Sequence, residues 1–172
     1  MSITDYFKVI TNTKKTGDKI IIFTDGACVN NGKRNAKGGV GIYYQDSVKP
    51  NVSICLKGSK HTNNKAELTA IKMAIESCED DDEIIIYTDS EYAINCITKW
   101  APGWELKNWT RKGKEVANKD LIRDILYLYR KRNVFLKHVR SHQQPPQNPE
   151  LYKIWYGNMM ADKLAFQGIS AP

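Results

Sequence analysis

The segment IIIFTDG at residues 20–26 decides the fold class, because the chain repeats its pattern as IIIYTDS at residues 84–90. Each copy is an apolar run that ends on Thr-Asp and a small residue. Apolar runs of this length predict strands. Two strands that finish on Asp25 and Asp89 put both carboxylates at sheet ends, where open α/β proteins build their binding sites.

Two further acids belong to predicted helices. Glu67 lies in TNNKAELTAI, and Asp162 lies in GNMMADKLA. Four carboxylates from four separate elements have one common reason to converge, which is to bind hard divalent cations through oxygen. A single acid at a strand end is usually only a solvated turn residue. The prediction of a metal site therefore rests on the repeated pattern and on the whole set of four.

Hydrophobic periodicity predicts an order of elements βββαβααβα. The expected strands cover about residues 19–24, 38–45, 51–58, 84–88 and 134–139, and the expected helices cover about 65–78, 90–99, 120–131 and 157–167. Three consecutive strands favour antiparallel hairpins, whereas strand–helix–strand crossovers favour parallel pairs. We therefore expect an α/β domain with a mixed five-stranded sheet, three antiparallel strands followed by two parallel ones, flanked by helices.

The composition limits the classes of protein to which this chain can belong. The length of 172 residues, with 26% charged and 41% hydrophobic residues, fits one ordinary globular domain. Residues 1–17 are polar and aperiodic, so we expect an N-terminal extension or linker there and a single domain over 18–172. No apolar stretch reaches membrane-spanning length, and no secretory signal pattern opens the chain. The cysteines form no Cys-x-x-Cys pair, so we expect reduced thiols and an intracellular protein. Such a protein would be nuclear, cytoplasmic or encoded by a virus. The four are Cys28, Cys55, Cys78 and Cys96.

The net charge of +7 is unevenly distributed along the chain. Residues 99–140 hold twelve Lys or Arg against four Asp or Glu, an excess of eight, so the rest of the chain nets −1. A basic segment of this kind is typical of a surface that binds a polyanion. The alternative is a solvated helix face, which can account for part of the excess at Arg123, Arg130, Lys131 and Arg132.

Seven motifs in a fixed order support a resemblance to a known family. They are FTDGACVNNGK, GGVGIYY, HTNNKAEL, IYTDSEYAINCITKWAPGW, GKEVANKD, HVRSH and GNMMAD. Over about residues 19–168 the chain resembles the catalytic domain of a type 1 ribonuclease H of the eukaryotic kind. The resemblance implies hydrolysis of the RNA strand of RNA/DNA hybrids with 5′-phosphate and 3′-hydroxyl products. It implies two Mg²⁺ ions, with Mn²⁺ as a substitute.

The same resemblance implies roles for single residues of the catalytic site. Asp25 would bridge both ions, with Glu67 and Asp89 on one side and Asp162 on the other. His142, in a polar stretch, matches a mobile histidine that assists proton movement or product release, which suits a group that titrates near neutrality. His138 is expected to be structural, and His61 has no assigned role.

Contacts with the two nucleic-acid strands are also implied by the resemblance. Asn31, Asn63 and Asn64 would contact the RNA strand, since amides both donate to and accept from a 2′-hydroxyl. Turn and helix-capping chemistry is the alternative explanation for these asparagines. On the DNA strand, Lys60, Thr62 and Asn118 would hold a phosphate, and Tyr92 and Trp100 would pack against sugars.

The segment WAPGWELKNWTRKGK at residues 100–114 interleaves aromatic and basic side chains, a combination that suits a nucleic-acid groove. It resembles the basic arm of the family, with Pro102 and Glu105 diluting its positive charge. For Trp104 and Trp109, an equally good alternative to nucleic-acid binding is that they anchor an irregular loop on the core. The basic residues of the arm are Lys107, Arg111, Lys112 and Lys114.

Two departures from the family pattern stand out. The interval between His142 and Asp162 is long, and residues 143–156 form an insertion that either folds against the body or offers a binding surface. The residues that would make either contact are Leu151, Tyr152, Trp155 and Tyr156. Met159 stands where the motif usually carries an additional Glu, which is expected to alter metal affinity or pH dependence.

The N-terminal decapeptide MSITDYFKVI suggests a protein partner. Its Ile3, Tyr6 and Phe7 are spaced like a sliding-clamp-binding peptide, in which one helical turn brings i, i+3 and i+4 to the same side. Packing of the three side chains on the domain's own surface is an equal alternative. We expect a monomer. Competing functions are a catalytically weak hybrid-binding protein of the same fold, another metal nuclease or integrase of that fold, and a fragment of a reverse transcriptase.

Overall fold

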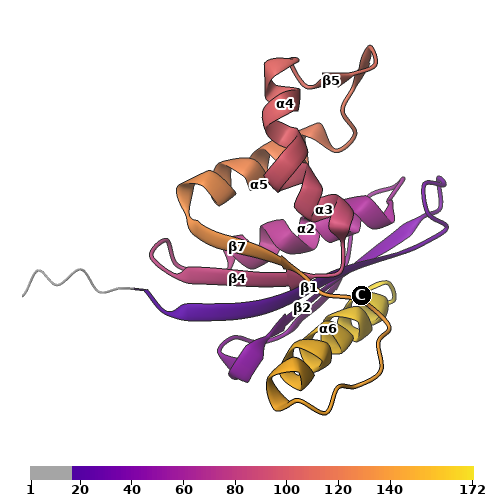
Figure 1. Cartoon of the computed structure of the whole chain (residues 1–172). Coiled ribbons are helices and arrows are strands. Elements are labelled where there is room, and N and C mark those ends of the chain that lie inside the picture. Colours follow the sequence, from indigo (N-terminus) through magenta and orange to yellow (C-terminus); the bar gives the residue numbers. More distant parts are fainter. Residues whose placement is uncertain (1–16) are drawn as a thin grey trace, which may run out of the picture.

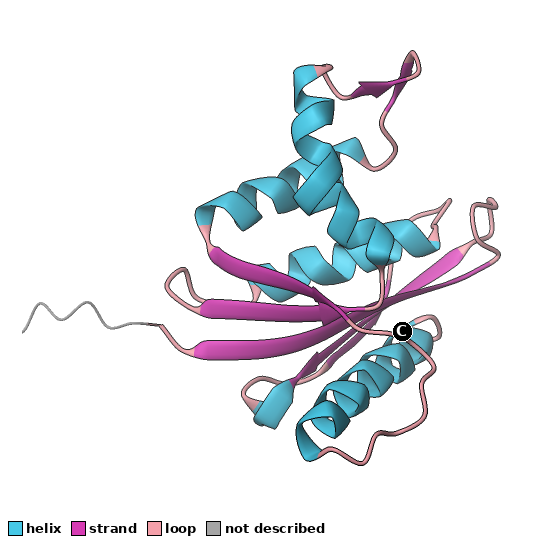
Figure 2. Cartoon of the chain, in the orientation of Figure 1, coloured by secondary structure: helices cyan, strands magenta, loops and turns pink. Residues whose placement is uncertain are grey.

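The computed structural model describes residues 17–172. The predicted clamp-binding residues Ile3, Tyr6 and Phe7 lie outside the described residues, so that hypothesis stays a prediction. Figure 1 and Figure 2 show a sheet with helices on both faces and a helical arm that projects from one side. Among residues 17–172, none of the helices combines the length and the apolar character needed to cross a bilayer.

The sheet confirms the predicted mixed topology. Its strands are β1 (Lys19–Val29), β2 (Lys37–Tyr44), β3 (Val52–Cys55), β4 (Glu83–Thr88) and β7 (Asn133–His138). They lie in the order β3-β2-β1-β4-β7, with β1, β2 and β3 antiparallel and β1, β4 and β7 parallel. Parallel strands need crossover connections, and helices supply both crossovers.

Helices on one face of the sheet form the larger part of the core. They are α2 (Asn63–Glu76), α3 (Glu91–Asn95) and α5 (Lys119–Lys131), which lie above the sheet in Figure 1. The side chains of Ile22, Ile84 and Ile86 point from the central strands into this layer and are completely buried against residues of α2. At about 25 cal/mol per Å² of apolar area, such burial is the main term that stabilises the fold.

The opposite face is covered by α6 (Pro149–Gly168), which packs on β2 and β1. This contact depends on glycines in β2. A Cβ atom added to Gly41 would collide with the main-chain O of Ala161 and N of Ala165, and one added to Gly39 would collide with the O of Ala165. The backbones of strand and helix therefore touch directly at these positions.

The prediction for the last helix was wrong at its start, because α6 begins at Pro149 rather than at about residue 157. Asn148 caps the helix, since its Oδ1 accepts hydrogen bonds from the main-chain N–H groups of Glu150 and Leu151 at 3.0 and 3.1 Å. Proline at the first helical position is favourable, since its missing N–H has no partner there. Residues 143–156 had been expected to form an insertion ahead of this helix.

Two strand ends and one helix end also differ from the prediction. β1 continues to Val29 because Thr24 through Val29 pair with β2, although its parallel pairing with β4 ends at Phe23–Tyr87. β3 is confined to Val52–Cys55. The helix expected to end at residue 99 continues through a π-helical turn (Cys96–Trp100) into α4 (Ala101–Leu106). A short hairpin, β5 (Thr110–Arg111) and β6 (Lys114–Glu115), completes the arm.

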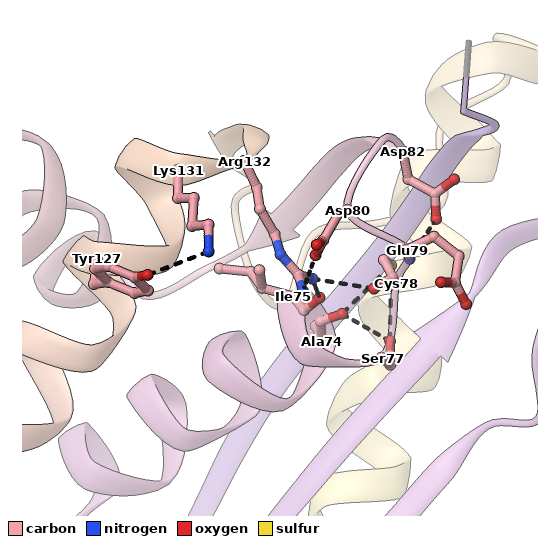
Figure 3. A network of polar contacts seen from close by, with 10 residues as sticks. All are labelled: Ala74, Ile75, Ser77, Cys78, Glu79, Asp80, Asp82, Tyr127, Lys131 and Arg132. Carbon is pink, nitrogen blue, oxygen red and sulfur yellow. Dashed lines mark hydrogen bonds and ion pairs between the residues drawn. The ribbon is translucent and has the colours of Figure 1, made fainter. Parts of the chain in front are cut away.

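Arg132 closes the C-terminal end of α2 (Figure 3). Its Nη1 donates to the main-chain O of Ile75 at 2.7 Å and of Cys78 at 3.1 Å, and its Nη2 lies 2.6 Å from Asp80 Oδ1. Carbonyls at a helix end lack intrahelical partners, so a guanidinium there both satisfies them and complements the helix dipole. Arg132 is thus a structural cap rather than part of a polyanion-binding surface.

We expect Arg132→Met to lower the free energy of unfolding by about 1–3 kcal/mol, because it leaves the carbonyls of Ile75 and Cys78 without their charged donor. Denaturant unfolding of the two proteins measures the change. Lys131→Met is the matched control, since Lys131 contacts only Tyr127 in this network (Figure 3) and its loss should change stability by less than about 0.5 kcal/mol. Equal losses in the two variants would contradict the capping role.

Candidate active site

Three acids from three elements meet at one edge of the sheet. Asp25 lies in β1, Asp89 directly follows β4, and Glu67 lies in the second turn of α2. One carboxylate oxygen of each lies within 4.8 Å of those of the other two. Because β1 and β4 run parallel and in register at Phe23–Tyr87, Asp25 and Asp89 arrive side by side two residues later.

Close backbone packing brings α2 to this edge. A Cβ atom added to Gly26 would collide with the main-chain N of Glu67 and with Ala66. The glycine after Asp25 therefore lets α2 approach β1 until carboxylate oxygens of Glu67 and Asp25 lie within 4.8 Å of each other. The Thr-Asp-Gly sequence thus has a steric reason as well as a chemical one.

Asp162 approaches the three acids from the opposite side of the sheet. It lies on α6 and lines a hollow of about 100 Å³ together with Asp89 and His142. Its negative charge is one cause of the raised pKa of Asp89. His142 itself is exposed and has a left-handed backbone with φ 53°, which is uncommon for a residue other than glycine.

Burial and mutual repulsion raise the pKa values of Asp25, Glu67 and Asp89. Desolvation by burial, followed by the charges of Asp89 and Asp162, raises the pKa of Asp25 from 3.8 to about 7. Burial and the charge of Asp25 raise the pKa of Glu67 well above its ordinary value, and burial with the charge of Asp162 raises that of Asp89. Carboxylates this close cannot all ionise without a compensating cation.

The donor set fits a hard divalent cation. All the converging ligand atoms are carboxylate oxygens, which Mg²⁺ and Mn²⁺ accept and which softer metals do not favour. Glu67 Oε2 is buried and has no hydrogen-bond partner among residues 17–172. A buried acceptor without a partner is costly, and a cation at this point would satisfy it.

A groove beside the acids brings together most of the predicted nucleic-acid contacts. The hollow of about 580 Å³ lies between the start of α2, the arm and the segment before α5. It is lined by Asn31, Thr62, Asn63, Asn64, Tyr92, Trp100, Arg111 and Asn118. Lys60 lines an adjoining open hollow that it shares with Asn118, Lys65 and Lys119.

Hydrogen bonds join the loops that form one wall of this groove. The main-chain N–H of Asn63 donates to Asn31 Oδ1 at 3.0 Å, and that of Gly32 donates to the O of His61 at 2.9 Å. The cap of α2 is Thr62, whose Oγ1 accepts from the N–H of Lys65 at 3.1 Å. Capping therefore does not occupy the side-chain amides of Asn63 and Asn64, and both residues are exposed.

The arm carries both aromatic and basic groups, as expected. Trp109 is buried at 7% exposure and anchors the arm on the core, whereas Trp100 remains 41% exposed. Trp104 lies between them, with ring centroids 5.8 Å from Trp100 and 6.3 Å from Trp109. Lys107, Arg111 and Lys112 line a second open hollow along this aromatic row, and Lys114 lies exposed on β6. Glu105, which had been expected to dilute the charge of the arm, is paired with Arg130 of α5 through two hydrogen bonds of 2.9 and 2.7 Å.

From the sequence alone, His61, Asn158 and Trp155 had no role near the acids or the groove, although Trp155 was expected to contact the body or to form a binding surface. His61 is 1% exposed, and neither ring nitrogen has a partner among residues 17–172. Asn158 has a buried Oδ1 without a partner in the same range, and it lines the hollow of Asp89 and Asp162. Its spacing of four residues from Asp162 was a signal that it shares a helix face with the acid. Trp155 lines that hollow as well.

The predicted insertion resolves into a loop and the first turns of α6. Trp155 and Tyr156 fold against the body, and Tyr156 meets Tyr43 of β2 edge-on with ring centroids 5.8 Å apart. Leu151 and Tyr152 stay exposed at 56% and 44%. The first alternative therefore holds for Trp155 and Tyr156, and a binding surface at Leu151 and Tyr152 stays a prediction. Met159 lines the hollow beside Asp162 and offers it no charge.

Known proteins resemble this chain in both sequence and fold. The model of the family described as RNase H matches residues 17–170. The chain is 36% identical over 154 residues to a ribonuclease H of Schizosaccharomyces pombe, which covers 89% of this chain and 54% of that protein. It is 36% identical over 155 residues to human ribonuclease H1, and the match covers 88% of this chain and 50% of the human protein. The chain thus spans about half the length of these curated relatives.

A bacterial relative matches along almost its whole length. A ribonuclease H of Thiobacillus denitrificans is 33% identical over 156 residues, with 90% of this chain and 95% of that protein covered. Among solved structures, a type 1 RNase H with the type 2 active-site motif superposes with a TM-score of 0.66 at 22% identity, covering 90% of this chain and 72% of that one. The RNase H domain of a foamy virus superposes with a TM-score of 0.64 at 24% identity, covering 88% and 94%. At these identities the structures show a common fold.

Proposed function

The chain belongs to the RNase H family, and from that premise we propose that it hydrolyses the RNA strand of RNA/DNA hybrids with the help of two divalent metal ions. The products would carry 5′-phosphate and 3′-hydroxyl ends. The observation that carries the proposal is the convergence of Asp25, Glu67 and Asp89 at one sheet edge, with Asp162 across the adjoining hollow. A groove rich in amides and aromatic rings lies beside them.

The four acids would hold the cations, with Mg²⁺ the proposed ion and Mn²⁺ a substitute. When bound, such ions supply an activated water and neutralise charge on the phosphate. Asp25 lies where it can serve both ions, because its carboxylate is near Glu67 and Asp89 and its pKa responds to Asp162. His142 would accept or donate a proton at the leaving oxygen as the product departs, a task that suits an exposed imidazole.

The groove residues would select the hybrid. Asn31, Asn63 and Asn64 would exchange hydrogen bonds with 2′-hydroxyls of the RNA strand. Thr62, Asn118 and Lys60 would hold a phosphate of the DNA strand. Tyr92 and Trp100, whose rings lie edge-on at 6.1 Å, would pack against sugars that lack the 2′-hydroxyl. The arm would add charge contacts with the backbone.

Three matched duplexes test the proposal. An RNA/DNA hybrid, an RNA/RNA duplex and a DNA/DNA duplex of one sequence are incubated with the protein and Mg²⁺, and then with Mn²⁺. Cleavage of the RNA strand in the hybrid alone supports the function. Tight hybrid binding without cleavage would instead favour the competing hypothesis of a catalytically weak hybrid-binding protein. We further propose that the protein acts inside the cell and as a monomer, the former supported by the four free cysteines.

We predict different salt responses for the two groups of groove contacts. Asn63→Ala with Asn64→Ala should reduce hybrid cleavage about tenfold at both low and high salt, since hydrogen bonds to 2′-hydroxyls are local. Alanine at Lys107, Arg111 and Lys112 should mainly flatten the dependence of binding on salt, because fewer counterions are released. Cleavage assays at low and high salt measure the first effect, and fluorescence anisotropy over a salt series measures the second. An unchanged slope in the triple variant would place the arm away from the nucleic acid.

A further inference from the structure

The loop that carries His142 is attached to α6 by one hydrogen bond. The indole Nε1 of Trp155 donates to the main-chain O of Gln143 at 2.8 Å. Gln143 directly follows His142, and its own Nε2 donates to the O of Ser141 at 3.1 Å. The two bonds therefore enclose His142 on both sides within a tight left-handed turn.

The anchor of this attachment is itself well fixed. Trp155 contacts Tyr152 with ring centroids 5.3 Å apart, and Tyr152 stacks on Tyr156 at 6.3 Å. Tyr156 in turn meets Tyr43 of the sheet. Contacts between aromatic rings restrict their rotation and contribute beyond the area they bury. The indole N–H is thus held at a set place relative to β2 and to the rest of α6.

The attachment lies beside the converging acids. Trp155, Gln143 and His142 line the same hollow as Asp89 and Asp162. The early start of α6 makes this possible, because residues 149–156 add two turns of helix ahead of Gly157. A chain in which the helix began at residue 157 would have no rigid donor opposite Gln143.

The size of the effect follows from the kind of bond. One neutral hydrogen bond contributes about 0.5–1.5 kcal/mol. That is little for a whole domain, but it changes the ratio of two loop conformations by about two- to tenfold. The bond between Trp155 and Gln143 therefore affects where His142 spends its time more than it affects whether the protein folds.

We propose that Trp155 is a positioning residue that holds the His142 segment over the metal-binding acids through the main-chain oxygen of Gln143. This inference rests on the proposed function, in which His142 moves a proton during hydrolysis of the hybrid. Trp155 would not contact the substrate. It acts by raising the fraction of time that His142 lies at the site.

The variant Trp155→Phe tests the inference, because it keeps an aromatic ring and removes the N–H donor. We expect kcat on an RNA/DNA hybrid to fall two- to tenfold with KM unchanged, since the groove residues belong to other elements. In a His142→Ala background the same substitution should have no further effect on kcat. Tyr152→Phe, in the same aromatic cluster, is the matched control and should leave kcat within about twofold of the original.

Two kinetic outcomes would overturn the inference. One is an unchanged kcat in Trp155→Phe. The other is an equal loss in the presence and absence of the His142 side chain, which would mean that Trp155 acts independently of His142. The cycle of two single variants and one double variant separates these results from the expected one.

A second measurement keeps this inference separate from the proposed function. Amide hydrogen exchange of the metal-free protein, without nucleic acid, should be two- to tenfold faster at residues 141–143 in Trp155→Phe and unchanged in β1 and β4. If hybrids are not cleaved but exchange still rises, the attachment stands and the function fails. If hybrids are cleaved and exchange is unchanged, the function stands and the positioning role fails.

Discussion

Cleavage of an RNA/DNA hybrid with Mg²⁺ is expected to fall at least about a thousandfold in Asp25→Asn and in Asp89→Asn, a loss of about 4 kcal/mol in transition-state stabilisation. Each substitution removes one negative oxygen ligand and changes the volume of the side chain very little. We expect the larger loss of cleavage for Asp25→Asn, because the charges of both Asp89 and Asp162 act on the Asp25 carboxylate and one of its oxygens lies within 4.8 Å of an oxygen of Glu67. Single-turnover cleavage and calorimetric titration with Mg²⁺ measure the two consequences separately.

Asp124→Asn is the matched control for this experiment. Asp124 is an exposed acid of α5 that pairs with Lys72 at 2.9 Å, away from the converging carboxylates. Its loss should leave both cleavage and metal binding close to those of the original protein. Near-normal cleavage in Asp25→Asn or Asp89→Asn would refute the metal-ion mechanism, whatever the control shows.

The metal-free protein is expected to lose about 2–4 kcal/mol of stability as the pH rises from about 4 to about 8, since a tenfold change in a proton-binding constant corresponds to about 1.4 kcal/mol. The folded state raises the pKa of Asp25 from 3.8 to about 7 and raises that of Glu67 as well. A carboxyl whose pKa is higher in the folded state contributes stability that is complete below its unfolded pKa. That stability is lost as the pH rises through the folded pKa.

Urea unfolding at a series of pH values, with a chelator present, measures this loss. Asp25→Asn should flatten the profile and raise the midpoint near neutral pH, since it removes one of the mutually repelling charges. Mg²⁺ should restore stability at pH 8 in the original protein and should have much less effect in the variant. A metal-free profile that rises between pH 5 and 8 would contradict the assignment of these protonation states.

The central strands of the sheet could be predicted from the sequence because the patterns that indicate them are local and occur twice. The runs before Asp25 and Asp89 each predicted a strand, and the crossovers predicted their parallel pairing. The extension of β1 to Val29 was not predictable in the same way. Residues after Gly26 have no strand pattern of their own, and they become a strand because β2 lies beside them.

The site was predictable to the extent that its residues occur in motifs. The convergence of Asp25, Glu67 and Asp89 followed from the ends of strands and the start of a helix. The approach of Trp155 to Gln143 did not, because it depends on where α6 begins, and the predicted helix began only at about residue 157. A single Asn148 cap and Pro149 at the first helical position decided the outcome. The burial of His61 has no sequence signal, since it depends on packing against Gly38 of β2.

The direct main-chain contact between β2 and α6 has a consequence for which substitutions this protein can accept. At Gly39 and Gly41 no side chain separates strand from helix, so the spacing of the two backbones is set by atomic radii alone. Asp162 is the residue after Ala161, whose carbonyl faces Gly41. A methyl group at residue 41 would move α6 outward and, with it, one side of the cation site. Substitutions at Gly41, which pairs with Asp25 in the sheet, are therefore expected to lower metal affinity without changing any ligand. This close contact limits which residues β2 can accept.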